Sequence, residues 1–166
     1  MSSVSVTFQL FISRNITEHD VIDESELVAR FEDYRPVLAR KDEHYGAVVF
    51  RSASAQAAFE DDLWHLVFNL CFRSIPALAD AGTFRTRLYV NPGEILMRRD
   101  GESVHIEDDQ GVSIEMPWPD VAPALVACGE RFIALLRRLD GQPVNAKLIA
   151  MLEEQRQPAL EILRKL

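Results

Sequence analysis

The sequence contains little of what most cofactor, metal and catalytic sites require. Its seven glycines are scattered singly and form neither GxGxxG nor GxxxxGK, the loops that cradle phosphates. The two cysteines are not in CxxC spacing and the four histidines form no HExxH pair, which disfavours zinc and redox sites. No Gly-x-Ser-x-Gly elbow presents a serine nucleophile. We therefore expect no cofactor, no metal and no enzymatic activity.

Long hydrophobic runs and an excess of positive charge are also missing. The longest apolar stretch, residues 63–72, contains His65 and Asn69 and is far shorter than the roughly 20 residues that span a bilayer. The net charge of −8 and the pI near 5.0 argue against nucleic-acid binding, which needs a basic face. We expect neither a membrane nor a nucleic acid among the partners.

The N-terminal residues and the cysteines indicate the compartment. Residues 1–6 alternate polar with apolar side chains and carry no basic segment, so we expect no signal peptide. Cys71 and Cys128 lie in apolar runs, where free cysteine behaves as a small hydrophobe. Reduced core cysteines without a signal peptide predict a cytoplasmic protein.

The chain has the composition of one ordinary globular domain spanning residues 1–166, with 48% hydrophobic and 27% charged residues. Alternating apolar side chains predict a strand over 4–12, and a short β-branched run predicts another over 45–50. Helical spacing runs from residue 23 to about 40 and predicts a helix over 25–34, with Pro36 kinking or breaking its continuation. A long helix is expected from Ser52 or Ser54 to about residue 79.

Two apolar stripes run along the second half of this long helix. One contains Leu63, Val67, Leu70 and Cys71, and the other contains Trp64, Phe68, Phe72 and Ile75. A helix that is apolar on two faces is expected to lie buried between layers, here between a sheet and the C-terminal helices. The alternative is that one stripe forms a homodimer or partner surface.

Residues 83–116 predict a β-meander of four short strands at 84–90, 94–99, 102–107 and 112–116. The breaks between them contain Asn91-Pro92-Gly93, Asp100-Gly101 and a loop that ends at Gly111, all typical of turns. Helices are expected at 121–139, from Asn145 onward, and again from Pro158. The predicted fold is α+β, an antiparallel meander sheet packed on one face by helices, with a buried central helix and a helical C-terminus.

Acidic residues gather in three clusters, which are our candidate partner-binding residues. They are Asp20, Asp23 and Glu24, then Glu60, Asp61 and Asp62, and then Glu107, Asp108 and Asp109. Such clusters speed the encounter with a basic protein and disfavour wrong partners. The alternative is that they complement helix N-termini and keep the surface soluble.

The outward positions of the meander offer a second surface. Its candidate residues are Arg85, Arg87, Tyr89 and His105. Glu107 or Glu115 could orient His105 as a base, although no nucleophile accompanies it. Asp61 and His65, four apart on the predicted helix, could share a metal, but such acid–imidazole pairs are common helix contacts, so no metal site is predicted.

Three short motifs follow one another from the meander into the next helix. They are Leu88-Tyr89-Val90-Asn91-Pro92-Gly93, Arg99-Asp100-Gly101 and, after a Pro-rich break, Gly129-Glu130-Arg131-Phe132. Over roughly residues 83–140 the chain thereby resembles small bacterial immunity proteins of polymorphic toxin systems. The resemblance implies a cytosolic protein that binds a cognate toxin domain and blocks its active site or substrate, without cofactor or turnover.

The partner that this resemblance implies suits the negative charge, because an acidic inhibitor of a basic nuclease or deaminase could mimic nucleic acid. The resemblance rests on no catalytic motif, and no binding residue of the family transfers to a position here. Two other functions stay open. One is a homodimeric structural or regulatory adaptor, and the other is a small ligand-binding domain or enzyme that uses the surface around His105.

Overall fold

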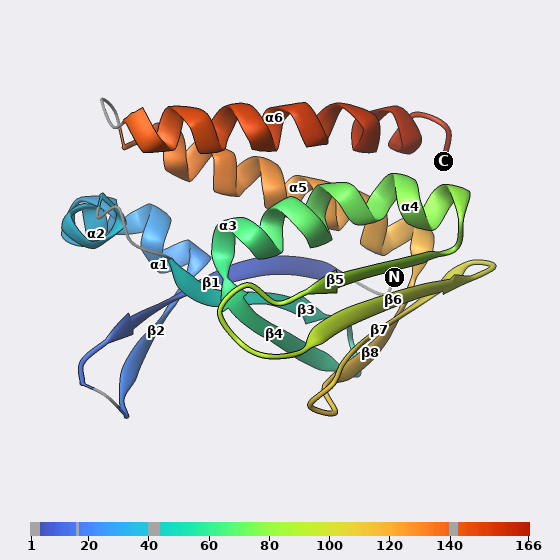
Figure 1. Ribbon diagram of the computed structural model, residues 1–166, viewed down its shortest axis with the longest axis horizontal. Coiled ribbons are helices and arrows are strands. Elements are labelled where there is room, and N and C mark those ends of the chain that lie inside the picture. Colours follow the sequence, from blue (N-terminus) through green and yellow to red (C-terminus); the bar gives the residue numbers. More distant parts are fainter. Residues whose placement is uncertain (1–3, 16, 40–43, 140–142) are drawn as a thin grey trace.

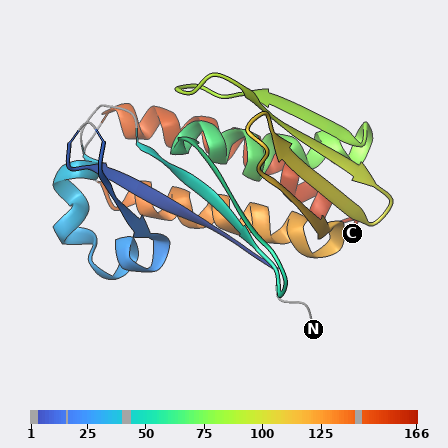
Figure 2. The ribbon, with the colours of Figure 1, turned by 90° about the horizontal axis from the view of Figure 1, so that it is seen from below.

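The computed structural model describes residues 4–15, 17–39 and 44–139, together with 143–166. Two four-stranded antiparallel sheets lie on one side of the molecule, and most of the helices cover their inner faces (Figures 1 and 2). This arrangement confirms the predicted α+β class. The single meander sheet of the prediction is accompanied by a second sheet that the sequence patterns showed only in part.

The first sheet has the strand order β2-β1-β3-β4, and neighbouring strands are antiparallel. Its strands are β1 (Ser5–Ser13), β2 (His19–Asp23), β3 (Tyr45–Arg51) and β4 (Gln56–Asp62). The alternation that predicted β1 is real, since Val6, Phe8 and Leu10 are all buried. The predicted strands 4–12 and 45–50 are therefore confirmed.

The prediction that a helix starts at Ser52 or Ser54 is wrong, because residues 56–62 form strand β4. A turn closes the hairpin between β3 and β4: the backbone N–H of Ser52 donates to the Ala55 carbonyl at 2.8 Å. Alternation then places Ala57 and Phe59 inward and Glu60 outward. The period of two in this short segment was hidden by the helix-forming residues that fill it.

The central helix begins at Leu63 and runs through three consecutive segments. They are α3 (Leu63–Leu66), the π-helical η1 (Val67–Arg73) and α4 (Ser74–Asp80). The side chain of Asp62 caps its start by accepting hydrogen bonds from the backbone N–H groups of Trp64 and His65 at 3.1 and 3.3 Å. The acid therefore works as an N-cap and not as a residue of the helix.

Burial of this central helix agrees with the two stripes. Phe72 and Ile75 have no exposed surface, and neither have Leu70 and Cys71 on the other stripe. The η1 segment packs on the C-terminal helices, as predicted. Trp64 and Phe68, at the start of the second stripe, are only half-buried.

The second sheet is the predicted meander, with strand order β5-β6-β7-β8 and antiparallel pairing throughout. Its strands are β5 (Thr83–Arg87), β6 (Glu94–Asp100), β7 (Ser103–Asp108) and β8 (Ser113–Pro117). The inner face buries Ile95, Met97, Val104 and Ile106. Glycines with positive φ occupy the connections, for example Gly101 at 59° in the β6–β7 turn.

The C-terminal region consists of two long helices, α5 (Trp118–Arg137) and α6 (Pro143–Leu163). The prediction of a new helix at Pro158 is wrong, since Pro158 lies inside α6 and costs that helix one backbone hydrogen bond without ending it. Before β3, α1 (Glu24–Ala29) and α2 (Phe31–Leu38) replace the single predicted helix. The break falls at Arg30, whose φ is −115°, and Pro36 is inside α2.

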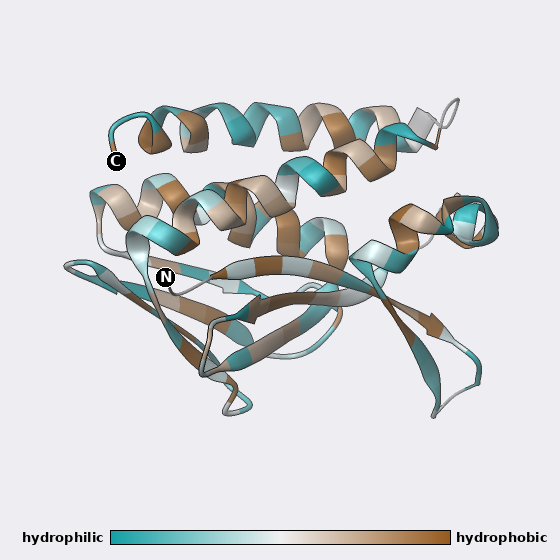
Figure 3. Cartoon of the chain, turned by 180° about the vertical axis from the view of Figure 1, so that it is seen from behind, coloured by the Kyte–Doolittle hydropathy of each residue, from teal (hydrophilic) through white to brown (hydrophobic). Residues whose placement is uncertain are grey.

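One continuous hydrophobic core joins the two sheets to the helices. The helix α5 packs on both β1 and η1, and α6 covers α5 and η1 from outside (Figure 1). Hydrophobic and hydrophilic residues alternate along α6, as expected for an outer helix with one packed face (Figure 3). Among the described residues, no helix is long and apolar enough to cross a membrane.

Both cysteines are free thiols in this core. Burial raises the pKa of the Cys71 thiol well above its usual value, and a hydrogen bond with Cys128 raises this pKa further. Neither thiol has exposed surface. The prediction that they are reduced core residues agrees with this placement.

Candidate functional site

The carboxylate of Asp61 fastens the second sheet to the edge of the first. It accepts hydrogen bonds from the backbone N–H groups of Tyr89, Val90 and Asn91 at 2.5, 2.8 and 3.3 Å, and it has no exposed surface. Bonds from N–H groups to an ionised carboxylate are among the stronger hydrogen bonds in proteins. The loop 88–93, which connects β5 to β6, is therefore held in one position against β4.

Asn91 crosses the same boundary with its side chain. Its Nδ2 donates to the Tyr45 hydroxyl at 2.7 Å and to the backbone carbonyl of Glu60 at 3.3 Å. We call this boundary between the first sheet and the loops of the second sheet the seam. Backbone and side-chain hydrogen bonds together make the seam a fixed feature of the surface.

A small pocket of ≈ 250 Å³ opens at the seam. The residues that line this seam pocket are Tyr45, Ala58, Glu60, Leu88, Asn91, Asp108, Gln110 and Val112. The fold thus brings Glu60 of the second predicted acidic cluster together with Asp108 of the third. The volume lies below the roughly 300–1,000 Å³ of small-molecule sites, so it suits a single side chain better than a whole ligand.

The charge of the seam pocket is negative, because neither arginine nor lysine lines it. Within the described ranges, no ion pair involves Glu60 or Asp108. Asp108 shapes the adjoining turn by accepting from the backbone N–H groups of Gln110 and Val112, both at 2.9 Å. Its neighbour Asp109 is exposed and accepts from the Glu94 backbone N–H at 3.0 Å.

The first acidic cluster lies elsewhere, beside β1 and α1. Asp20 pairs with Arg14 at 2.6 Å, and Asp23 accepts from the Gln9 amide at 2.8 Å. Asp23 and Glu24 also line a shallow hollow of ≈ 720 Å³ that contains Arg51 and Arg131. Opposite charges are mixed there, so this hollow does not share the uniform sign of the seam pocket.

Three of the nine predicted partner-binding acids are internal. Asp61 and Asp62 have no exposed surface, and Glu24 has 8%. Their carboxylates bind backbone N–H groups of this chain, and Glu24 also pairs with Arg131. Asp61 and Asp62 cannot contact a partner, and Glu24 offers little surface to one. All three are structural residues, because a buried carboxylate needs internal donors.

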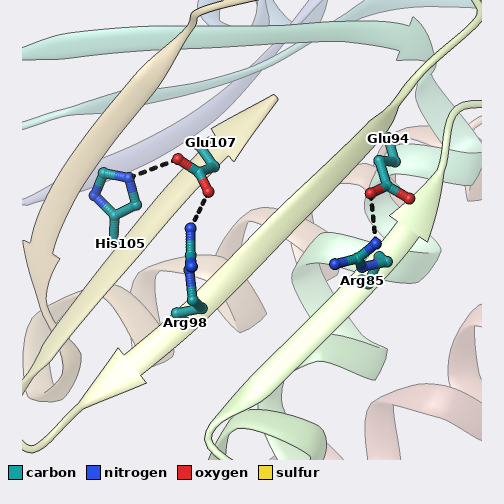
Figure 4. Close-up of polar contacts among 5 residues, drawn as sticks. All are labelled: Arg85, Glu94, Arg98, His105 and Glu107. Atoms are coloured by element: carbon teal, nitrogen blue, oxygen red, sulfur yellow. Dashed lines mark hydrogen bonds and ion pairs between the residues drawn. The ribbon is translucent and has the colours of Figure 1, made fainter. Parts of the chain in front are cut away.

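The outer face of the second sheet carries charges of both signs, as its alternation predicts. Arg98 and His105 both contact Glu107, and the imidazole Nε2 of His105 lies 3.2 Å from a carboxylate oxygen of Glu107 (Figure 4). Arg85 forms a separate ion pair with Glu94 at 2.8 Å (Figure 4). The hydrogen bond from His105 and the charge of Arg98 lower the pKa of the Glu107 carboxyl. This face therefore neutralises much of its own charge.

The histidines make contacts that are typical of structural residues. His105 hydrogen-bonds to a carboxylate, His65 Nε2 lies 2.8 Å from the Arg87 carbonyl, and His44 Nε2 lies 2.9 Å from the Leu38 carbonyl. Asp61 lies on β4 and not on the helix of His65, so the proposed acid–imidazole pair does not share a helix. In the part of the chain that the structure describes, no group of three or more His, Cys, Asp or Glu residues could hold a metal.

The sequence placed Tyr89 on the outer face of a strand at 84–90 and Trp64 and Phe68 on a separate apolar stripe, but β5 ends at Arg87 and the structure brings Tyr89 to the two stripe residues. The Trp64 ring centroid lies 6.1 Å from that of Phe68 and 6.3 Å from that of Tyr89. Val90 follows Tyr89, and these two are 45% and 55% exposed. We call Trp64, Phe68, Tyr89 and Val90 the aromatic patch. The available signal was the turn Asn91-Pro92-Gly93, which had to present the preceding residues at the surface.

No protein-family model matches the chain, and no curated protein or solved structure is significantly similar to it. The case for a function therefore depends on the residues of the seam and of the two sheet faces.

Proposed function

We propose that this chain is a non-catalytic binding protein that captures a basic protein, and specifically an immunity protein that neutralises a cognate bacterial toxin in the cytoplasm. The observation that carries the proposal is the seam pocket. Glu60 and Asp108, from two separate acidic clusters, line one small pocket without a basic residue beside them. A lysine or arginine of a partner would provide the missing charge.

The surface around His105 supports a ligand-binding or enzymatic function less well. Its charged groups are largely satisfied by one another through Arg98–Glu107–His105 and Arg85–Glu94. Ser103 lies nearby, but its hydroxyl donates to Glu115 at 2.5 Å. Among the hydrogen bonds of the described residues, His105 has no hydroxyl or thiol partner that it could activate.

The homodimeric adaptor is supported less well for a different reason. Phe72 and Ile75, half of the stripe that would form such a dimer, are completely buried within the chain. Only Trp64 and Phe68 of that stripe reach the surface in part. A dimer would have to use a smaller contact than the stripe suggested.

The test is co-expression with the toxin encoded by the neighbouring gene. We expect the chain to rescue growth and to co-purify with the toxin domain. Glu60→Gln combined with Asp108→Asn should weaken capture at least tenfold, since each of two charge pairs contributes on the order of 1 kcal/mol or more. Measuring the dissociation constant at two salt concentrations should show that the wild type loses more affinity in high salt than the double variant.

Glu154→Gln provides a control for the loss of surface charge, because Glu154 is exposed on α6, away from the seam. It removes one negative charge and should leave capture nearly unchanged. If the chain neither rescues growth nor co-purifies with the toxin, the immunity function is wrong. If Glu154→Gln weakens capture as much as the double variant does, the seam pocket is not where the toxin binds.

A further inference from the structure

The aromatic patch concentrates exposed apolar surface at one place. Five large apolar side chains are exposed in the described residues: Val21, Val28, Tyr89, Val90 and Leu166. Tyr89 and Val90 are the adjacent pair among them, and Trp64 and Phe68 extend their surface across α3 and η1. Tyrosine and tryptophan at a surface of this kind are the residues that most often dominate binding energy.

The aromatic patch and the seam pocket are two sides of the same loop. Leu88 and Asn91 line the pocket, while Tyr89 and Val90, between them in the chain, are exposed. The three backbone hydrogen bonds to Asp61 hold this loop in place. A surface that is already ordered loses less conformational entropy when a partner binds.

We infer that the aromatic patch and the seam pocket form one docking surface for an extended segment of a basic protein. A lysine or arginine of that segment enters between Glu60 and Asp108, and a neighbouring apolar side chain packs on Tyr89 and Trp64. This inference rests on the proposed function and adds the recognised chemistry, a basic residue beside an apolar one. Its layout is that of protein interfaces in general, with aromatic anchors beside a polar rim.

Charge selects this occupant over a second copy of the chain. A two-fold symmetric dimer through the patch would bring the same surface of each copy together. Glu60, Asp108 and Asp109 would then enter the interface from both copies, which adds like charges there, and the chain already carries a net charge of −8. Arg73, whose guanidinium lies 5.7 Å from the Phe68 ring centroid, borders the patch on the side of η1. The His65 ring borders it at Tyr89, with 5.7 Å between the two ring centroids.

The experiment is an NMR titration of the ¹⁵N-labelled chain with three peptides of equal length. A peptide of alternating lysine and leucine should shift the Trp64 indole signal and the Tyr89 and Val90 amides. Oligolysine should shift signals near Glu60 and Asp108 more than the Trp64 indole. A peptide of alternating glutamate and leucine should shift none of these. Shifts centred on Val21 or Val28, or no binding of the lysine–leucine peptide, would overturn the inference.

Val90→Ala and Val28→Ala form a matched pair, because the two valines are 45% and 48% exposed and the change is the same. Val90→Ala should weaken the binding of the lysine–leucine peptide about fivefold, and Tyr89→Ala should weaken it about tenfold or more. Val28→Ala should leave its affinity unchanged. Equal losses in the two valine variants would show that the patch is not the site.

The same variants separate this inference from the proposed function. If the toxin is captured but Tyr89→Ala and Val90→Ala bind it as the wild type does, the docking surface is wrong and the proposed function stands. If the lysine–leucine peptide binds at the patch but no toxin is captured, the docking surface stands and the immunity function is wrong.

Discussion

Glu24 and Arg131 form an ion pair that closes the free edge of strand β1. Glu24 begins α1 and Arg131 comes from α5, and both also bind the backbone of β1. Glu24 accepts from the Phe8 N–H at 3.4 Å, and Arg131 donates to the Val6 carbonyl at 2.7 Å. Strand β2 pairs only with residues 9–13, so these side chains satisfy the edge that β2 leaves uncovered.

Arg131→Met should therefore destabilise the fold. The substitution leaves the Glu24 carboxylate without its counter-charge and the Val6 carbonyl without a donor. We expect a loss of about 2–3 kcal/mol in the free energy of unfolding, below the 3–5 of a fully buried pair because the Arg131 side chain is 44% exposed. Urea denaturation measures it. Arg14→Met, which breaks the exposed pair with Asp20, is the control and should leave the unfolding midpoint in place.

Asp61→Ala should release the loop that carries Tyr89 and Val90. Three backbone N–H groups lose a charged acceptor, which we expect to cost about 2–4 kcal/mol in the free energy of unfolding. Hydrogen exchange at these amides should accelerate more than exchange in β7. Glu60→Ala removes the neighbouring, exposed carboxylate and should change neither quantity. Unaltered exchange in Asp61→Ala would show that the carboxylate does not hold the loop.

Local patterns predicted the elements whose periodicity was long and unmixed. The alternation in β1 and the turns of the β5–β8 meander depend on neighbouring residues alone, so the sequence was sufficient for them. Strand β4 was mistaken for a helix because four of its seven residues are alanine, glutamine or glutamate, which favour helices. Its pairing with β3, a contact between chain segments, overrode that preference.

The candidate site also depends on contacts between distant chain segments, which local sequence patterns do not reveal. The sequence marked Glu60 and Asp108 as acidic but could not show that they share a pocket, because that depends on how the two sheets meet at Asn91 and Tyr45. It also could not separate Glu60 from Asp61. In a strand, neighbouring side chains point to opposite faces, so one acid is exposed and the next is buried. A helical interpretation of the segment removed that distinction.

Gly129→Ala tests how closely α5 approaches the central helix. A Cβ at this position would lie 2.3 Å from the Cζ of Phe72, which is completely buried. Alanine favours a helix over glycine by about 1 kcal/mol, yet we expect a net loss of about 1–3 kcal/mol because of the clash. In a Phe72→Leu background the same substitution should cost less, which a double-mutant cycle measures. Stabilisation by Gly129→Ala in the wild type would contradict this packing.

The pH dependence of stability should contain a contribution from His44. Burial lowers the pKa of this imidazole below its ordinary value of 6.5, and the hydrogen bond to the Leu38 carbonyl offsets only part of that effect. Below pH 6.5 the unfolded chain therefore binds a proton that the folded chain resists, and the free energy of unfolding falls as the pH falls. His44→Gln should flatten the pH profile between pH 7 and 5 in urea titrations. A profile for His44→Gln as steep as that of the wild type would mean that other groups cause the decline.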